Sequence, residues 1–204
     1  MATDAPVRPP GTAKLPRGER EMLLLDAARE EFGALGYGGA SLGSIAARAG
    51  VSKALIVTYF GSKDGLYAAC VERAGGNLRN RIEAVITAAL PPAEAVPATL
   101  AAIFEGLEGR QQDWHVLNDR TVPSGTAGAA AASVQRRAVA EQASRGVASA
   151  EYFQPMEPDD QEIIAAVWMS AVSAVVDWWF RHPDRSVSEM SERCARVLAA
   201  ITHI

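Results

Sequence analysis

The sequence predicts an all-α protein with an N-terminal three-helix helix-turn-helix head and a longer C-terminal helical domain. Three observations carry this prediction. Alanine is abundant while charged residues make up an ordinary 22% of the chain, which favours a folded helical protein over a disordered one. Two short apolar-faced segments joined at a glycine lie within residues 41–63. Wide apolar stripes at helical spacing occupy the C-terminal third.

Size and composition limit the possible classes. A chain of 204 residues suits one or two small domains with enough length to bury a core. No uninterrupted run of about eighteen apolar residues is present, and the N-terminus lacks the apolar core of a secretory signal. The two cysteines, Cys70 and Cys194, lie on apolar helix faces and are expected to be reduced, buried thiols. A cytoplasmic protein with no membrane partner is therefore expected.

Residues 17–35 form the first expected helix. Leu25, Ala28 and Phe32 recur at helical spacing, so this face should pack on the short helices that follow. Gly36 ends the helix, because glycine readily adopts the backbone conformation of a helix C-terminus.

Residues 41–63 predict two short helices joined by a sharp turn. Ser41 caps the first, Gly50 is free to take positive φ, and Ser52 caps the second. In a helix-turn-helix the second helix lies in the DNA major groove with its N-terminal residues foremost. The segment therefore predicts double-stranded DNA as a partner.

Three motifs in and around this stretch resemble one family. They are FxxxGY at residues 32–37, IAxxAGVS at 45–52 and YFxSKxxLY at 59–67. Residues 30–71 closely resemble the DNA-binding domain of the TetR family of transcriptional regulators. The resemblance implies a homodimer that binds a palindromic operator and carries a helical effector-binding domain, and it implies no cofactor. The rest of the chain matches the family only in length and helical character.

The candidate DNA contacts combine the motif geometry with this resemblance. Lys53, Ala54, Leu55 and Val57 fall where TetR-like regulators contact bases. Leu55, Val57 and Thr58 replace the usual Thr, Tyr and His, so thymine methyls and DNA shape gain importance, while Lys53 is the candidate for guanine. The complete set assigned to DNA bases or phosphates is Ser41, Gly43, Ser52, Lys53, Ala54, Leu55, Val57, Thr58, Tyr59 and Lys63.

The charge of the chain divides unevenly. Residues 1–63 carry a formal charge of +2 and residues 64–204 carry −6, which fits a weakly basic DNA-facing head on an acidic body. The Pro-rich residues 1–16 are expected to be a disordered arm. Two interpretations of the arm stay open. It is either a solubilising tail or a segment from which Arg8, Lys14, Arg17 and Arg20 reach the DNA minor groove or backbone.

Residues 64–204 are expected to form the effector-binding and dimerisation domain. A long helix starts after a cap at Ser62 and continues past Gly75-Gly76, which marks either a kink or a close packing point. Shorter helices are expected at about residues 93–108, 111–120 and 129–152, separated by Pro- and Gly-containing breaks.

The last two helices are apolar over an arc too wide for one buried face. One face is expected to pack within the protomer and the other against a second copy, while a self-sufficient monomer core is the alternative. The residues assigned to the dimer interface are Ile164, Trp168, Ala171, Val175, Trp178, Trp179, Met190, Cys194, Val197, Leu198 and Ile201.

A mixed apolar and polar set in the middle helices is typical of a small-ligand pocket. Ordinary core packing is the competing interpretation of each aromatic residue. No spacing typical of a zinc site, phosphate loop or nucleophile elbow is present, so neither a metal site nor catalysis is expected. The residues assigned to the effector pocket are Phe104, Leu107, Trp114, His115, Leu117, Asn118, Trp168, Met169 and Val172.

These inferences predict a TetR-like transcriptional regulator, a repressor, that responds to a small, largely apolar effector. The alternative keeps the fold and loses specific DNA recognition, leaving a dimeric small-molecule-binding protein. The apolar Leu55 and Val57, together with the modest basic charge, are the features that favour this alternative.

Overall fold

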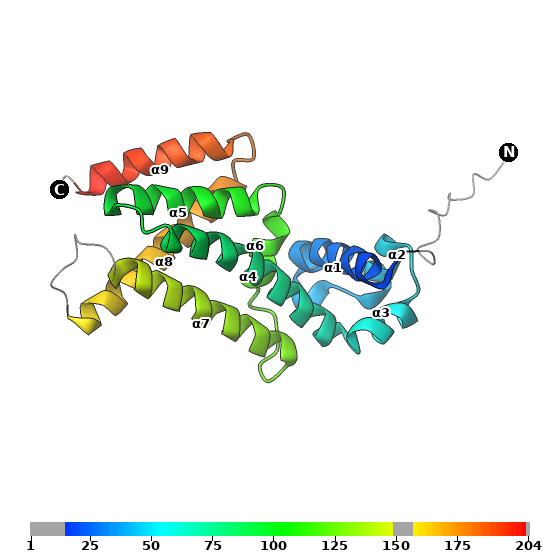
Figure 1. The fold of residues 1–204 in the computed structure, drawn as a ribbon. Coiled ribbons are helices and arrows are strands. Elements are labelled where there is room, and N and C mark those ends of the chain that lie inside the picture. Colours follow the sequence, from blue (N-terminus) through cyan, green and yellow to red (C-terminus); the bar gives the residue numbers. More distant parts are fainter. Residues whose placement is uncertain (1–14, 149–156, 203–204) are drawn as a thin grey trace. The chain divides into compact units, whose positions relative to one another are not determined.

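A computed structural model describes residues 15–148 and 157–202, with the side chains of residues 92–93 and 198–202 excepted. Most of the expected arm and the end of the helix expected to reach residue 152 lie outside the described residues, as do the side chains of Leu198 and Ile201. The described part of the chain is all-helical, as predicted (Figure 1). Its helices are α1 (Arg17–Gly39), α2 (Leu42–Ala49), α3 (Lys53–Phe60), α4 (Lys63–Thr87), α5 (Pro92–Leu107), α6 (Gln111–Leu117), α7 (Ala127–Ala148), α8 (Pro158–Phe180) and α9 (Val187–Thr202).

The chain divides into two compact units. The first unit holds the described residues up to Ala74 together with Gln112–Ala132, and the second holds Gly75–Gln111 and the residues from Ser133 onward. The sequence placed the boundary after residue 63, whereas the structure places it inside α4 and returns residues 112–132 to the first unit. Helices α4 and α7 each run from one unit into the other.

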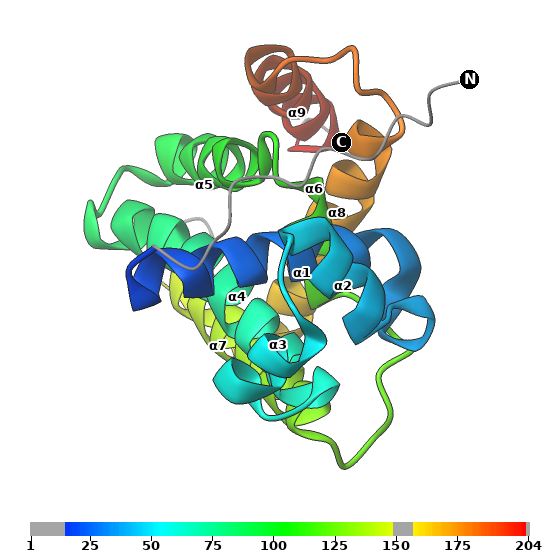
Figure 2. The ribbon, with the colours of Figure 1, turned by 90° about the vertical axis from the view of Figure 1, so that its right-hand side faces the viewer.

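An aromatic cluster forms the centre of the first unit. The ring of Tyr67 meets Phe32 and Tyr37 edge-on, at centroid distances of 4.9 and 5.2 Å. Tyr67 is fully buried, and its hydroxyl donates a hydrogen bond to the Val116 carbonyl at 2.8 Å. A buried Tyr needs such a partner for its hydroxyl, so the cluster joins α1, α4 and α6 into one core. Figure 2 shows these three helices as ribbons.

Two carboxylates hydrogen-bond residues 112–132 to the N-terminal part of the first unit. Asp64 accepts hydrogen bonds from the N–H groups of Ala127 and Gly128, at 2.7 and 2.9 Å, and so satisfies the N-terminus of α7. Asp119 accepts from the N–H of Tyr37 at 2.5 Å. These bonds join residues far apart in sequence, so residues 112–132 are a structural part of the first unit.

The second half of α4 lies along α7 in the second unit. Gln135 is buried and accepts a hydrogen bond from the Arg79 guanidinium at 3.0 Å, while Gln142 donates to the Arg79 carbonyl at 3.0 Å. A Cβ added to Gly75 would lie 2.5 Å from Gln135 Oε1. Of the two sequence interpretations of this glycine, the close packing point is the one observed, because α4 continues without a break.

A salt bridge, referred to below as the clamp, joins α4 to α7 near the C-terminal ends of both helices. Arg145 donates two hydrogen bonds to Glu83, at 2.5 and 2.9 Å, and Gln142 donates a third at 2.8 Å. The hydrogen bonds from Arg145 and Gln142 lower the pKa of Glu83 to about 2. Because the folded pKa lies below the unfolded one, the clamp acts above the unfolded pKa and is lost only as pH falls toward 2.

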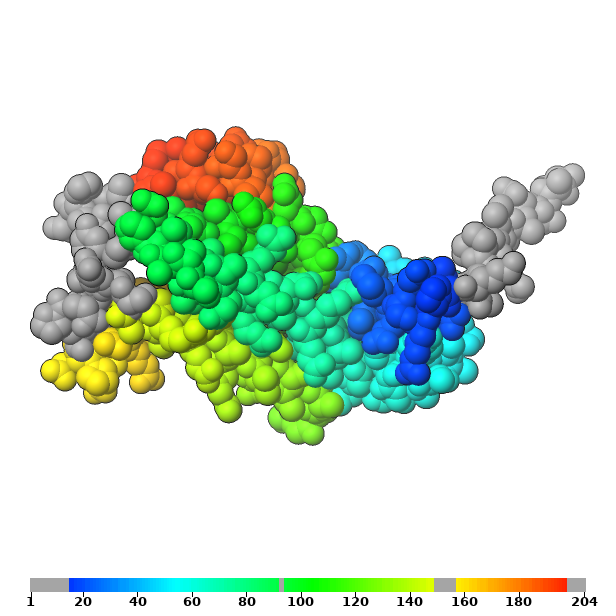
Figure 3. Space-filling model, in the orientation of Figure 1, coloured from blue at the N-terminus to red at the C-terminus, as the bar shows by residue number. Residues whose placement is uncertain are grey.

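Helices α5, α8 and α9 complete the second unit. Helix α9 lies on α5 (Figure 3). Trp179 of α8 meets Phe104 of α5 edge-on, at a centroid distance of 5.3 Å. Helix α8 is long and apolar enough to cross a membrane, and 22% of its most apolar window is buried. The sequence contains no uninterrupted apolar run of this length, so the expectation from it is that no helix spans a membrane. One such helix is weak evidence for a membrane span, since packed helices of globular proteins pass it too.

Candidate DNA interface and effector pocket

The helix-turn-helix has the caps and the turn that the sequence predicts. Ser41 accepts a hydrogen bond from the Ser44 N–H at 3.0 Å, and Ser52 accepts one from the Leu55 N–H at 3.2 Å. Gly50 lies between the two helices at φ 65° and ψ 31°, in the left-handed region. Each cap uses an acceptor lone pair of its serine, so the hydroxyl of Ser52 can still donate to a phosphate oxygen.

Helix α3 is held by one buried residue and presents its opposite face to solvent. Ile56 is fully buried under α3, while Lys53, Ala54 and Thr58 are exposed and Val57 is 41% exposed. The Thr58 hydroxyl donates to the Ala54 carbonyl at 2.9 Å, so its proton is engaged within the helix. None of the ten residues assigned to DNA is buried, and the structure brings them together around α2, α3 and the start of α4.

Several cations of the first unit are neutralised inside it. Arg48 of α2 lies 3.5 Å from the buried carboxylate of Glu31, which ties α2 to α1. Arg29 and Arg73 likewise face Asp113 and Asp26, at 4.0 and 2.9 Å respectively. The interface therefore depends on few cations.

Lys63 is a cation of the first unit whose charge is not neutralised by a salt bridge to a described carboxylate. Its ammonium sits 4.5 Å from the centroid of the Tyr37 ring, at the first residue of α4. A ring face attracts the ammonium without neutralising its charge, so Lys63 can still meet a phosphate.

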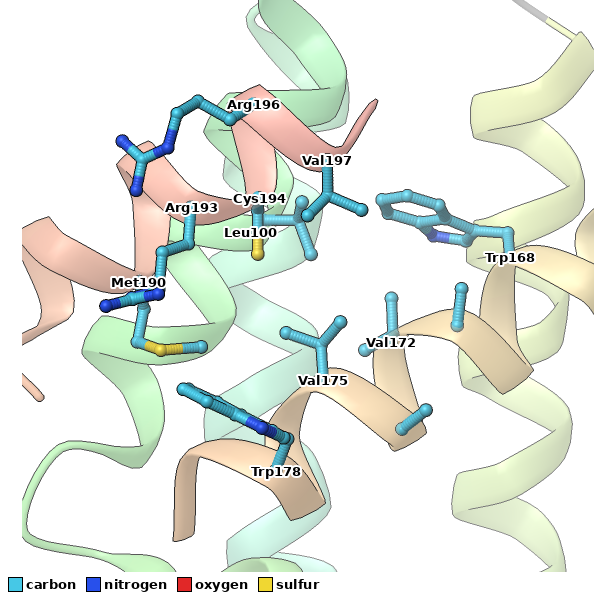
Figure 4. Close-up of a pocket in the computed structure, with 12 residues that line it drawn as sticks. Leu100, Trp168, Val172, Val175, Trp178, Met190, Arg193, Cys194, Arg196 and Val197 are labelled. Atoms are coloured by element: carbon cyan, nitrogen blue, oxygen red, sulfur yellow. The ribbon is translucent and has the colours of Figure 1, made fainter. Parts of the chain in front are cut away.

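A groove of about 470 Å³ lies between α5, α8 and α9 in the second unit (Figure 4). Trp168 and Trp178 mark the two ends of its α8 wall, and α9 faces them. The volume is in the range of small-molecule sites, and the lining is mostly apolar. The groove is lined by Leu100, Trp168, Ala171, Val172, Ala174, Val175, Trp178, Met190, Arg193, Cys194, Arg196 and Val197.

One end of the groove carries positive charge. The Arg193 guanidinium lies 5.7 Å from the centroid of the Trp178 ring, and its buried Nε has no hydrogen-bond partner among the described residues. The Trp178 ring also stacks on the His182 ring, at a centroid distance of 3.8 Å. This second contact helps to hold the indole in place. A buried donor without a partner is costly, so this end is suited to an acceptor group.

The structure does not bring the expected effector-pocket residues together. Trp168 and Val172 line the groove, and Met169 lies half-buried on the same helix. Phe104 and Leu107 are buried in the core of the second unit. The remaining four are in the first unit, because α6 packs Val116 and Leu117 against the core of that unit. Trp114 is buried, and His115 and Asn118 are exposed.

The residues expected at a dimer interface also divide. Trp179, Met190 and Cys194 are buried within the protomer, so their side chains serve its own core. Ile164, Trp168, Val175 and Trp178 are half-buried, and Ala171 and Val197 are exposed. The most exposed apolar side chains of α8 are instead Ile163 and Val167, at 61% and 63%. The helical period places Ser170 and Ala174 on the same face, and these four residues form the outer ridge.

Metal binding and thiol chemistry are the other candidate functions of the side chains. Within residues 15–148 and 157–202, no cluster of His, Cys, Asp or Glu could hold a metal ion. Both cysteines are buried free thiols, and burial raises the pKa of the Cys70 thiol to about 12, which makes it unreactive.

Comparisons with known proteins agree on the first unit. Residues 24–70 match the model of the family "Bacterial regulatory proteins, tetR family". The chain is 35% identical over 104 residues to the HTH-type transcriptional activator FasR of Mycolicibacterium smegmatis, which covers 51% of this chain and 48% of the relative. It thus matches about half the length of that curated relative.

Solved structures share the fold over nearly the whole chain. A TetR-like transcriptional regulator from Rhodococcus sp. RHA1 superposes with a TM-score of 0.70 at 28% identity, covering 91% of this chain and 99% of that one. The transcriptional regulator FadR from Bacillus subtilis, solved in complex with stearoyl-CoA, has a TM-score of 0.70 at 19% identity, with coverages of 87% and 96%. The capped helix-turn-helix, the family match and the shared fold lead to one conclusion: residues 24–70 are a DNA-binding domain of the TetR family, in a chain with the fold of TetR-like regulators.

Proposed function

We propose that the protein is a dimeric transcriptional regulator of the cytoplasm that binds a palindromic operator and responds to a small, largely apolar effector. The observation that carries this proposal is the presentation of α3. Its N-terminus is capped, its one buried residue, Ile56, fixes its rotation, and its base-facing side is exposed. This is the arrangement in which a recognition helix enters the major groove. The TetR family is non-enzymatic, so no reaction is proposed.

Repression is the proposed mode of regulation. A dimer that occupies a promoter-proximal operator blocks transcription, and an effector that prefers a different arrangement of the two DNA-binding units releases it. The FasR relative is named an activator. In vitro transcription from the recovered promoter distinguishes the two modes, because added protein lowers transcript yield for a repressor and raises it for an activator.

Sequence recognition is proposed to rest on one polar side chain and several apolar ones. Lys53 at the start of α3 can donate to guanine in the major groove, while Ala54 and Val57 can contact thymine methyl groups. So few polar contacts give DNA shape a share in the selection of the site.

The first test is selection of genomic fragments by the purified protein at about 0.1 M salt, followed by titration on the best fragment. We expect a palindrome bound near 10⁻⁸ M or tighter. The Lys53→Ala variant should bind this operator about 10- to 100-fold more weakly and lose discrimination at one base pair of each half-site, because a base contact of this kind contributes about 1–3 kcal/mol. Lys63→Ala should instead weaken binding to all sequences and lower the salt slope by about one.

The same titration decides between the proposal and its alternative. Uniform binding near 10⁻⁵ M that disappears with added salt would indicate a protein that has lost specific DNA recognition. An unchanged salt slope for Lys63→Ala would remove Lys63 from the phosphate contacts.

Dimerisation is proposed to use the outer ridge of α8 together with the exposed Val197 of α9, a residue that also lines the groove. Ile163 and Val167 leave more than half of their surface in water, and burying such side chains against a second copy is favourable. A two-fold pairing of α8 and α9 would bury these faces in a four-helix arrangement.

The effector is proposed to occupy the groove between α5, α8 and α9. Its apolar lining suits a hydrocarbon chain, and Arg193 at one end suits an anionic or thioester head. The FadR relative holds stearoyl-CoA, which is a molecule of this chemistry. We therefore propose a long-chain acyl compound as the effector class.

Calorimetric titration with stearoyl-CoA tests the groove. We expect Arg193→Ala to weaken binding at least about tenfold, because a hydrogen bond to a charged group contributes about 1.5–3 kcal/mol. Arg136→Ala, which removes an exposed arginine of α7, is the matched control and should bind as the parent does. Equal affinities for all three proteins would contradict the assignment of the groove. Coenzyme A alone should not bind, because it lacks the chain that fills the apolar lining.

A further inference from the structure

Two arginines in the first turn of α1 contact the recognition helix. The guanidinium carbon of Arg17 lies 5.5 Å from the centroid of the Tyr59 ring. Arg20 donates a hydrogen bond to the Tyr59 hydroxyl at 3.3 Å and another to the Leu15 carbonyl at 2.7 Å. Tyr59 is the seventh residue of α3, so one side chain of the recognition helix holds the start of α1 in place.

Tyr59 stands at the border of the face that α3 presents. With about 100° per residue, Ala54 and Thr58 lie at the middle of the exposed side, and Ile56 lies opposite. Tyr59 falls between Thr58 and Ile56, and it is half-buried. Its contact with Arg17 therefore places a cation beside the exposed side of α3.

Arg17 is well suited to an external anion. It is exposed, and no ion pair with a described carboxylate involves it, whereas Arg29, Arg48 and Arg73 face carboxylates inside the unit. An aromatic ring orients a guanidinium through its π face and leaves the positive charge and the edge N–H groups available. A guanidinium with a free edge binds phosphate in a bidentate manner.

Helix stability does not account for these arginines. The N-terminal turn of a helix carries partial positive charge, so cations there are unfavourable and belong at the C-terminus. Arg17 is the first residue of α1, and Arg20 follows within the same turn. Two cations in this turn therefore suit a partner that carries negative charge.

We propose that Arg17, seated on Tyr59, binds a backbone phosphate of the operator next to the recognition helix. Arg20 is a positioning residue that fixes the Tyr59 ring through its hydroxyl. The site adds a phosphate contact from α1 to those from α3 and the start of α4, and it compensates for the few cations of the helix-turn-helix. This inference rests on the proposed DNA-binding function.

The test measures the affinity of Arg17→Ala for the recovered operator across a range of salt concentrations. We expect the slope of log K against log[salt] to fall by about 0.9, since each phosphate contact releases roughly that number of counterions. At 0.1 M salt this corresponds to about eightfold weaker binding on operator and non-operator DNA alike. Arg136→Ala removes an equally exposed arginine from α7 and should leave the slope unchanged.

A second variant separates a phosphate contact from a structural role. Tyr59→Leu removes the aromatic ring that orients Arg17 while keeping an apolar side chain. It should therefore reduce the salt slope by a similar amount. Arg17→Ala should then have little further effect in the Tyr59→Leu background. Circular dichroism and thermal melting show whether each variant keeps the parent fold.

The outcomes separate the inference from the function on which it rests. A parent protein that binds the operator specifically, with an unchanged slope for Arg17→Ala, would overturn the inference and leave the function standing. Fully additive effects of the two substitutions would overturn the role of Tyr59 as the seat. A parent protein without specific DNA binding would overturn both.

Discussion

Val167→Asp is expected to convert the proposed dimer into a folded monomer and to weaken operator binding by about 100-fold or more. Val167 lies at the middle of the outer ridge and is 63% exposed within the protomer, so the substitution should not disturb the core. At a two-fold interface it would bury two unpaired carboxylates, each costing several kcal/mol. Operator affinity falls because two linked DNA-binding units gain about 10²–10⁴ in avidity over separate ones. Light scattering after size-exclusion chromatography measures the mass, and fluorescence anisotropy measures the affinity.

The chain offers a matched control for this substitution. Val134 of α7 is 58% exposed in the same unit, so Val134→Asp introduces the same charge at a similarly exposed helical position outside the ridge. This variant should remain dimeric and bind DNA as the parent does. A dimeric Val167→Asp would move the interface away from the outer ridge. A parent that is itself monomeric at micromolar concentration would contradict the dimer.

Tyr67→Ala is expected to destabilise the first unit by about 3–5 kcal/mol, the usual range for removing a fully buried aromatic side chain. The loss combines a cavity beside the rings of Phe32 and Tyr37 with the hydrogen bond to the Val116 carbonyl. A loss of this size is a large part of the stability of an ordinary domain. Urea unfolding followed by circular dichroism should show a lower midpoint for the transition of this unit.

Tyr67→Phe separates the two contributions. It keeps the ring and removes the hydroxyl, so it should cost only about 1–3 kcal/mol for the unsatisfied carbonyl. A Tyr67→Ala midpoint within error of the Phe variant would show that the ring contributes little. A chain of two units can depart from two-state unfolding, so the curves are fitted to one transition or two as the data require.

The local features of the fold could be predicted from the sequence. Serines at positions 41, 52 and 62 cap the helices that follow them, and Gly50 supplies the left-handed turn. These features depend on backbone bonds to residues a few positions away, which short-range patterns encode. The exposure of Lys53, Ala54 and Thr58 follows from the same local geometry, because burial of Ile56 fixes the rotation of α3.

The long-range features could not be predicted in this way. Nothing near Asp64 indicates that its carboxylate caps a helix more than sixty residues later, at Ala127. The aromatic α6 was assigned to the effector pocket because its composition suits a ligand, yet it packs into the first unit through Val116 and Leu117. Periodicity showed that α8 has more than one apolar face. It does not show which face the protomer itself covers: Trp179 is buried within the protomer, whereas Ile163 is exposed.

The two-part composition of the first unit has a consequence for synthesis on the ribosome. The segment up to Ala74 emerges early, but its core lacks the Val116 carbonyl and the α7 N-terminus until residues 112–132 have emerged as well. Chain elongation at about 5–20 residues per second makes this a delay of several seconds, during which the aromatic cluster is incomplete. The first unit thus completes its core only after residues 75–111 of the second unit have also emerged. Chimaeric regulators made by exchanging N-terminal segments should accordingly include both the segment up to Ala74 and residues 112–132. Without the second segment, the core of the first unit would be incomplete.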